Sequence, residues 1–120
     1  MRGIRGAITV EENSKDKIYD AVKLMTMGIL RTNHIDKSDI VAVIFSATPD
    51  LTAAFPAAGA RQIDGFDHVP LFDTVEMDVD GSLPMCIRAL VLVNSELSQE
   101  DIHHIYMGGA LPLRPDLARA

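Results

Sequence analysis

The chain has 120 residues, 48% of them hydrophobic, and a formal net charge of −6. The length predicts a single domain over residues 1–120, the composition excludes a disordered chain, and no apolar run approaches the ~20 residues that span a bilayer. The negative charge argues against nucleic acid and anionic membranes as general partners, and the one cysteine excludes an internal disulfide, so we expect a cytoplasmic protein.

The first part of the chain predicts two strands separated by a long helix. Residues 4–10 alternate loosely and contain β-branched side chains, which favours a strand. Apolar positions at three- and four-residue spacing then predict one amphipathic helix over residues 15–31, with Asn13 or Ser14 as its N-cap. The continuous apolar run over residues 39–46 is typical of a strand that is buried on both faces.

The second part of the chain alternates short helical and extended segments. A proline near its start predicts a short helix over residues 55–63, and residues 98–101 resemble another helical start. Further strands are expected over residues 69–75, 85–93 and 102–107. Gly108 and Gly109 are expected to loosen the chain before its last apolar residues.

This order of elements predicts an α/β fold of the α+β kind, in which one long helix packs on a mixed sheet. One long helix can cover only one face of a sheet. The other apolar face, which contains Leu90 and Leu92, needs cover, and a second copy of the chain is the economical solution. We therefore expect a closed homo-oligomer.

Arg88 is the most informative single residue. Strand alternation places it on the same face as Leu90 and Leu92, where a guanidinium is costly unless it is paired. One interpretation is an arginine that reaches solvent from the strand end or pairs with a structural carboxylate. The other is a donor aimed into a cavity at an anionic ligand.

Glu76 and Asp73 are candidate carboxylate partners for Arg88. A glutamate at the end of a strand is usually solvated, but Glu76 facing Arg88 would form a donor and acceptor pair able to orient an anionic ligand that carries a hydroxyl. Asp73, three residues earlier, can contribute to the same site. Two carboxylates that close would raise the pKa of at least one of them if both were buried.

Four other residues extend this set. Gly6 would let a ligand or a neighbouring backbone approach Arg5 closely. Tyr106 either donates its hydroxyl to a carboxylate or is half-buried with the hydroxyl in water. Arg61 and Arg114 read as charges on a helix surface and near the chain end, although each can widen an anion site.

The sequence carries no signal for a metal, a cofactor or a covalent nucleophile. The four histidines lack metal-ligand spacing, Cys86 has no paired histidine and reads as a core thiol, and no catalytic serine, phosphate-loop or dinucleotide motif occurs. What remains is arginines, a glutamate and a tyrosine. These suit a reaction without covalent intermediate or proton transfer, in which the site holds a flexible polyanion in a reactive shape and stabilises developing charge.

Short segments spread along the whole chain resemble the AroH-type monofunctional chorismate mutases in order and spacing. These segments are Arg2-Gly3-Ile4-Arg5-Gly6-Ala7, Ser46-Ala47-Thr48-Pro49-Asp50-Leu51, Phe55-Pro56-Ala57, Val69-Pro70, Glu76-Met77-Asp78-Val79, Cys86-Ile87-Arg88, Ile105-Tyr106 and Leu113-Arg114-Pro115-Asp116-Leu117. The resemblance implies a homotrimer folded as a pseudo-α/β barrel, with three active sites between subunits. It also implies the cofactor-free Claisen rearrangement of chorismate to prephenate, on the route to phenylalanine and tyrosine.

The resemblance assigns a role to each candidate. Arg88 would donate to the ether oxygen, Glu76 would accept from the ring hydroxyl, and the side-chain carboxylate would bind to Arg5 and Tyr106. The remaining substrate-binding positions would be the apolar walls Phe55, Ala57, Leu71 and Phe72, the neighbouring Asp73 and Thr74, and the arginines at the mouth, Arg61 and Arg114.

The chain also departs from the family pattern. Asp73 stands where many relatives have a cysteine, and it would bring a second negative charge close to Glu76. Ala58 stands where a lysine is common, and the tail after Leu117, which helps to close the site in relatives, is short. Two other functions stay open: a non-catalytic trimer that binds aromatic acids, and an imine-handling trimer of the YjgF/RidA kind.

Overall fold

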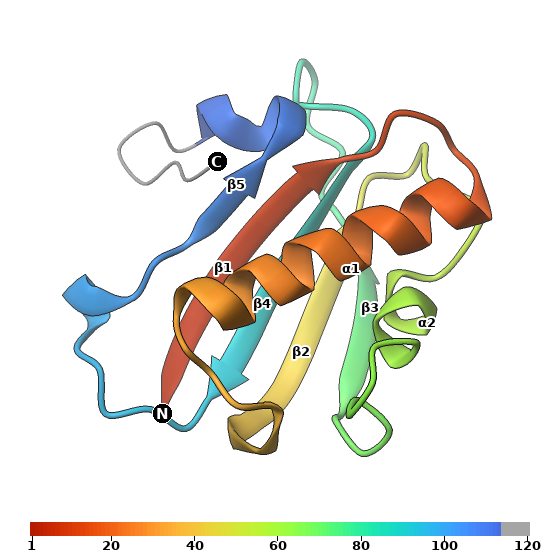
Figure 1. Ribbon diagram of the computed structural model, residues 1–120. Coiled ribbons are helices and arrows are strands. Elements are labelled where there is room, and N and C mark those ends of the chain that lie inside the picture. The colour runs from red at the N-terminus through yellow and green to blue at the C-terminus, as the bar shows by residue number, and fades with distance from the viewer. Residues whose placement is uncertain (114–120) are drawn as a thin grey trace.

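The computed structural model of the protein describes residues 1–113, which form a five-stranded mixed sheet with both α-helices on one face (Figure 1). The α-helices and strands are β1 (Arg2–Thr9), α1 (Lys15–Thr32), β2 (Ile40–Ala47), α2 (Pro56–Arg61), β3 (Leu71–Val75), β4 (Cys86–Val93) and β5 (Ile105–Met107). Three short 3-10 helices join them: η1 (Lys37–Asp39), η2 (Gln99–Asp101) and η3 (Gly108–Leu113).

The strand order is β3-β2-β4-β1-β5. The central strand β4 pairs antiparallel with β1 and β2, whereas the edge strands β3 and β5 run parallel to β2 and β1. The mixed α+β fold predicted from the sequence is therefore confirmed. In Figure 1 the long helix α1 crosses the sheet, and α2 lies beside β3.

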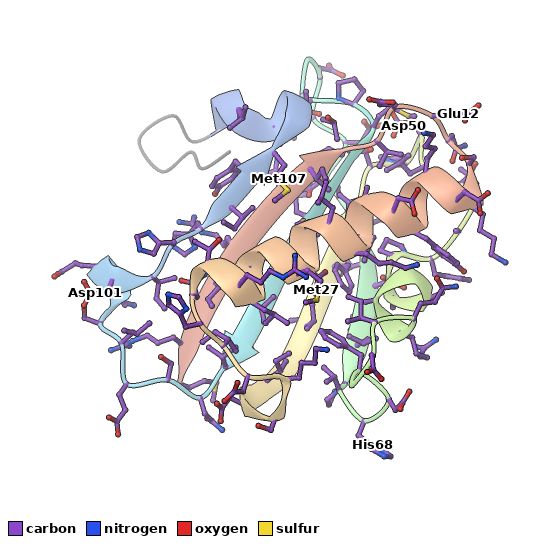
Figure 2. The ribbon with its side chains drawn as sticks, in the orientation of Figure 1. Glu12, Met27, Asp50, His68, Asp101 and Met107 are labelled. Atoms are coloured by element: carbon purple, nitrogen blue, oxygen red, sulfur yellow. The ribbon has the colours of Figure 1, made fainter. Side chains whose placement is uncertain are left out.

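The core lies between α1 and the sheet. Ser14 caps the helix, because its side chain accepts a hydrogen bond from the Lys17 N–H at 3.2 Å. From there a buried stripe of the helix packs on the sheet residues of the same core: Ile18, Val22, Met25 and Ile29 against Ile4, Val43, Phe45 and Val91. Met107 of β5 lies against this core at the sheet edge (Figure 2).

Gly6 allows side chains of the helix α1, and not a ligand, to lie close to the backbone of β1. A Cβ atom at this position would lie 2.7 Å from Cδ1 of Ile29 in α1. The glycine beside Arg5 therefore serves the packing of α1 on β1, and the sequence-based expectation that it leaves room for a ligand is not needed to explain it.

The opposite face of the sheet carries no α-helix among the described residues (Figure 1). On β2, Val43 and Phe45 are buried under the helices, whereas Ala42, Ile44 and Ser46 are only half-buried. The prediction that this strand is buried on both faces is therefore wrong for one chain. We call this surface the open face.

The end of the described chain also differs from expectation. Gly108 and Gly109 do not loosen the chain but begin η3, which packs Ala110 against Ala7, Cys86 and Tyr106. Gly108 has a φ of +59°, and the Gly109 N–H donates to Oγ1 of Thr9 at 2.8 Å. Glycine permits this turn because a Cβ at either position would collide with Thr9.

A membrane-spanning helix does not occur within residues 1–113: each helix there is too short or too polar to cross a bilayer.

Candidate active site

One row of directly paired residues crosses the open face. Tyr106 on β5 pairs with Ala7 on β1, and Ala7 pairs with Arg88 on β4. Arg88 pairs with Ser46 on β2, and Ser46 pairs with Thr74 on β3. Paired residues of neighbouring strands point to the same side, so the register itself brings these side chains together.

Glu76 joins this row from just beyond the end of β3. The Nε atom of Arg88 lies 3.1 Å from Oε2 of Glu76, and the hydroxyl of Ser46 donates to the same oxygen at 2.7 Å. The Glu76 N–H donates to the Ala47 carbonyl at 2.9 Å, so the backbone of this residue is also tied to β2. The structure thus brings together the donor and the acceptor that the sequence offered as a pair.

The two contacts on Glu76 differ in kind. The Nε atom of Arg88 is buried and, among the described residues, forms no hydrogen bond, so its contact with Glu76 is an ion pair without hydrogen-bond geometry. The Ser46 contact is a directional hydrogen bond. The Arg88 side chain is still 42% exposed, so much of its guanidinium faces the open side of the sheet.

A hollow of about 570 Å³ lies above this row, lined by Arg5, Tyr106, Arg88, Ser46 and their neighbours. Tyr106 is only 4% exposed, so the interpretation of a half-buried tyrosine is wrong. The small Ala7 lies between Tyr106 and Arg88 in the strand register and is itself buried against Tyr106 and Ala110. Two guanidinium groups and one carboxylate around this hollow give it a positive balance within an acidic protein.

Arg5 is held through its backbone at the rim of the hollow. Its N–H donates to Nδ1 of His104 at 2.9 Å, at the point where β5 leaves β1. The preceding residue, His103, is fixed by the buried Asn33, whose side chain accepts from the His103 N–H and donates to its carbonyl, both at 2.8 Å. The C-terminal end of α1 therefore anchors the segment that supports Arg5.

Asp73 does not lie beside Glu76. The two residues alternate along an extended segment, and Asp73 points to the helix side of the sheet, where it accepts a hydrogen bond from the Ala57 N–H at 3.0 Å. The expectation that Asp73 adds a second charge next to Glu76 is wrong within one chain. Burial raises the pKa of the Asp73 carboxyl above its ordinary value, although the bond from Ala57 and the charge of Arg61 act against this.

The other predicted substrate-binding residues gather with Asp73 around β3 and α2. Phe55 and Asp73 line a second hollow of about 680 Å³ on the helix side of the sheet edge. Of the surrounding residues, Ala57 is buried, Leu71 is half-buried and Arg61 is an exposed charge on α2. Phe72, which is 65% exposed, and Thr74 alternate with Asp73 and lie on the open face of β3. In one chain the predicted site residues therefore form two groups. Arg114 lies outside the described residues.

We expect Asp73→Asn to raise the free energy of unfolding at pH 7 by less than about 1 kcal/mol, because solvent screens this partly exposed group. The raised pKa means that the folded chain binds the Asp73 proton more tightly than the unfolded chain. Stability is therefore lost as the pH rises above 3.8, the ordinary value, through the folded pKa, and the asparagine removes this loss while its amide oxygen still accepts from Ala57.

Urea unfolding at one protein concentration, at pH 7 and below pH 3.8, measures this difference. The gain is expected only at pH 7. Asp67→Asn, on an exposed loop, is the matched control. A less stable Asp73→Asn protein at pH 7 would contradict the prediction.

Ser46, Thr48 and Asp50 contribute to the site although the sequence analysis gave them no role. Oγ1 of Thr48 accepts from the Cys86 N–H, and Oδ2 of Asp50 accepts from the Met85 N–H, both at 3.0 Å. These bonds hold the start of β4, two residues before Arg88. Figure 2 shows Asp50 near the end of the sheet where the chain passes from β1 to α1. The sequence signal for Ser46 is a polar side chain two residues after Ile44, on the same face of an otherwise apolar strand.

Cys86 lies in the core, and the described residues form no metal site. Cys86 is 1% exposed and packs with Ala7, Tyr106 and Ala110, which confirms a core thiol. Burial raises the pKa of this thiol, and the charge of Arg88 offsets part of the effect. Within residues 1–113, no three His, Cys, Asp or Glu side chains are placed to hold a metal ion.

The fold and the site together define a small mixed α/β protein with a positively charged hollow on the open face of its sheet. The sequence matches the model of the family "Chorismate mutase type I" over residues 1–117. The chain belongs to this family, which confirms the resemblance seen in the sequence.

Individual relatives agree with this assignment. The chorismate mutase AroH of Bacillus subtilis is 42% identical over 118 residues, covering 98% of this chain and 93% of the relative. The chorismate mutase AroH of Thermus thermophilus is 47% identical over 121 residues, covering 100% and 98%. A solved chorismate mutase from Clostridium thermocellum superposes with a TM-score of 0.89 at 39% identity, covering 92% of this chain and 97% of that one.

Proposed function

We propose that this protein is a chorismate mutase, an isomerase that rearranges chorismate to prephenate in the biosynthesis of phenylalanine and tyrosine. Membership of the family and full-length relatives that carry this name support the proposal. The single observation that carries it is that Arg88, paired with Glu76, lines a hollow together with Arg5 and Tyr106.

The reaction breaks the ether C–O bond of chorismate while a C–C bond forms elsewhere in the same molecule. Negative charge develops on the ether oxygen in the transition state, and the Arg88 guanidinium supplies donors there without reorganising. Glu76 accepts from the ring hydroxyl and fixes the ring. Because the rearrangement is unimolecular and transfers no proton, these side chains need no cofactor to carry it.

Arg5 and Tyr106 bind the side-chain carboxylate and hold the substrate in its folded conformer. Fixing a flexible dianion in a near-attack geometry removes an entropic part of the barrier. The positive balance of the hollow also attracts a dianion to a protein whose net charge is −6.

We further propose that the active protein is a cytoplasmic homotrimer with its sites between subunits. Phe72, Val75 and Met77 are exposed apolar side chains at the β3 edge, and Leu90 on the open face is also exposed, so both surfaces gain from cover. A neighbouring copy would then supply the group around Phe55 and Asp73 to the group around Arg88. This arrangement accounts for two sets of predicted site residues in one chain.

Two measurements test these proposals separately. We expect the purified protein to consume chorismate, followed by its absorbance, and to form prephenate in equal amount. We expect sedimentation to give three times the chain mass. A well-folded trimer that binds chorismate but does not consume it would show that the protein is an aromatic-acid-binding module and not an enzyme. A stable monomer would contradict the proposal that the sites lie between subunits.

A further inference from the structure

Ser46 lies in the row of residues across the open face and lines the hollow above it. It lies on β2 between Arg88 on β4 and Thr74 on β3, on the same face as both. Its hydroxyl donates to Oε2 of Glu76 at 2.7 Å. Neither the sequence pattern nor the proposed mechanism gives this serine a role in the reaction.

Glu76 needs an external hold on its carboxylate. The residue lies one position beyond β3, so the strand ladder fixes its backbone N–H but not its side chain. A free glutamate side chain has several rotamers, and ordering it costs conformational entropy. The Arg88 ion pair at 3.1 Å attracts the carboxylate but lacks hydrogen-bond geometry at Nε, so it sets no direction. The directional contact is the one from Ser46.

The place of this contact determines what the carboxylate can do. Both Ser46 and Arg88 act on the same oxygen, Oε2. A carboxylate held by one oxygen presents the other, Oε1, to a ligand hydroxyl. The serine also shares the task of binding Glu76, so the remaining N–H groups of Arg88 can serve the ligand.

We propose that Ser46 is a positioning residue that orients the Glu76 carboxylate for the rearrangement. This inference rests on the proposed chorismate mutase function. Without the Ser46 hydroxyl the Glu76 carboxylate can adopt other rotamers, so the removal of Ser46 affects the rate.

The test compares Ser46→Ala with Ser46→Thr. We expect Ser46→Ala to lower kcat/KM about tenfold, as for the loss of one hydrogen bond to a charged group. Ser46→Thr keeps the hydroxyl, suits a strand, and is expected to restore most of the activity.

Ser38→Ala is the matched control, since this exposed serine in η1 lies outside the site and makes the same chemical change. Unchanged activity in Ser46→Ala would overturn the inference, and so would a Ser46→Thr variant as impaired as Ser46→Ala. A wild-type protein that does not consume chorismate would instead overturn the proposed function, and this role with it.

Discussion

Replacing Arg88 with alanine is expected to lower kcat at least about 100-fold while the protein still folds. Loss of one preorganised donor to developing negative charge typically costs ~3–4 kcal/mol of transition-state stabilisation, or ~10²–10³ in rate. The folded state loses little, because the Arg88 side chain is 42% exposed and a pair of this kind stabilises a protein by about 1 kcal/mol or less. Steady-state kinetics with urea unfolding separates the two effects.

Two further variants sharpen the Arg88 experiment. Arg88→Lys keeps the positive charge but loses the planar fork of the guanidinium, and we expect it to fail nearly as badly. Arg31→Ala removes an exposed arginine from the last turn of α1 and is expected to keep full activity. An Arg88→Ala enzyme with near wild-type kcat would remove this residue from the mechanism.

The second large effect is expected for Glu76→Ala, with kcat/KM lowered about 100-fold. The variant loses the acceptor for the ring hydroxyl, and the loss of one hydrogen bond involving a charged group costs about 1.5–3 kcal/mol. It also removes the carboxylate that Arg88 contacts at 3.1 Å, so the guanidinium is no longer held in place.

Glu76→Gln shows how much of this loss comes from the charge of the carboxylate. Its single amide oxygen can replace the oxygen that accepts from Ser46, but the NH2 group then takes the place of the oxygen that faces the ligand, and the charge that makes such bonds about twice as strong is lost. We expect a smaller loss than for Glu76→Ala. Equal activity of the glutamine variant and the wild type would show that the ligand does not need the charge.

Much of the fold could be predicted from local patterns. The apolar spacing of residues 15–31 marks α1, and the apolar runs mark β2 and β4, because burial imposes a period on the sequence. Alternation also placed Arg88 on the face that the helices leave open. What the pattern does not contain is the order β3-β2-β4-β1-β5, which depends on pairing between distant segments.

The site shows the same division. Glu76 and Arg88 meet only because β3 lies parallel to β2 at the sheet edge, a fact of topology that no local spacing reveals. The error on Asp73 was of another kind. Positions three apart in an extended segment point to opposite faces, so the same alternation that placed Arg88 also separates Asp73 from Glu76.

Ala7 is the only residue between Tyr106 and Arg88 in the row across the open face. Its methyl group is buried against Cys86, Tyr106 and Ala110, so a larger side chain here would displace these neighbours or enter the hollow that Ala7 helps to line. Arg5 lies two residues earlier on the same strand and lines the same hollow. One short stretch of β1 therefore sets both the room and part of the charge that a ligand meets.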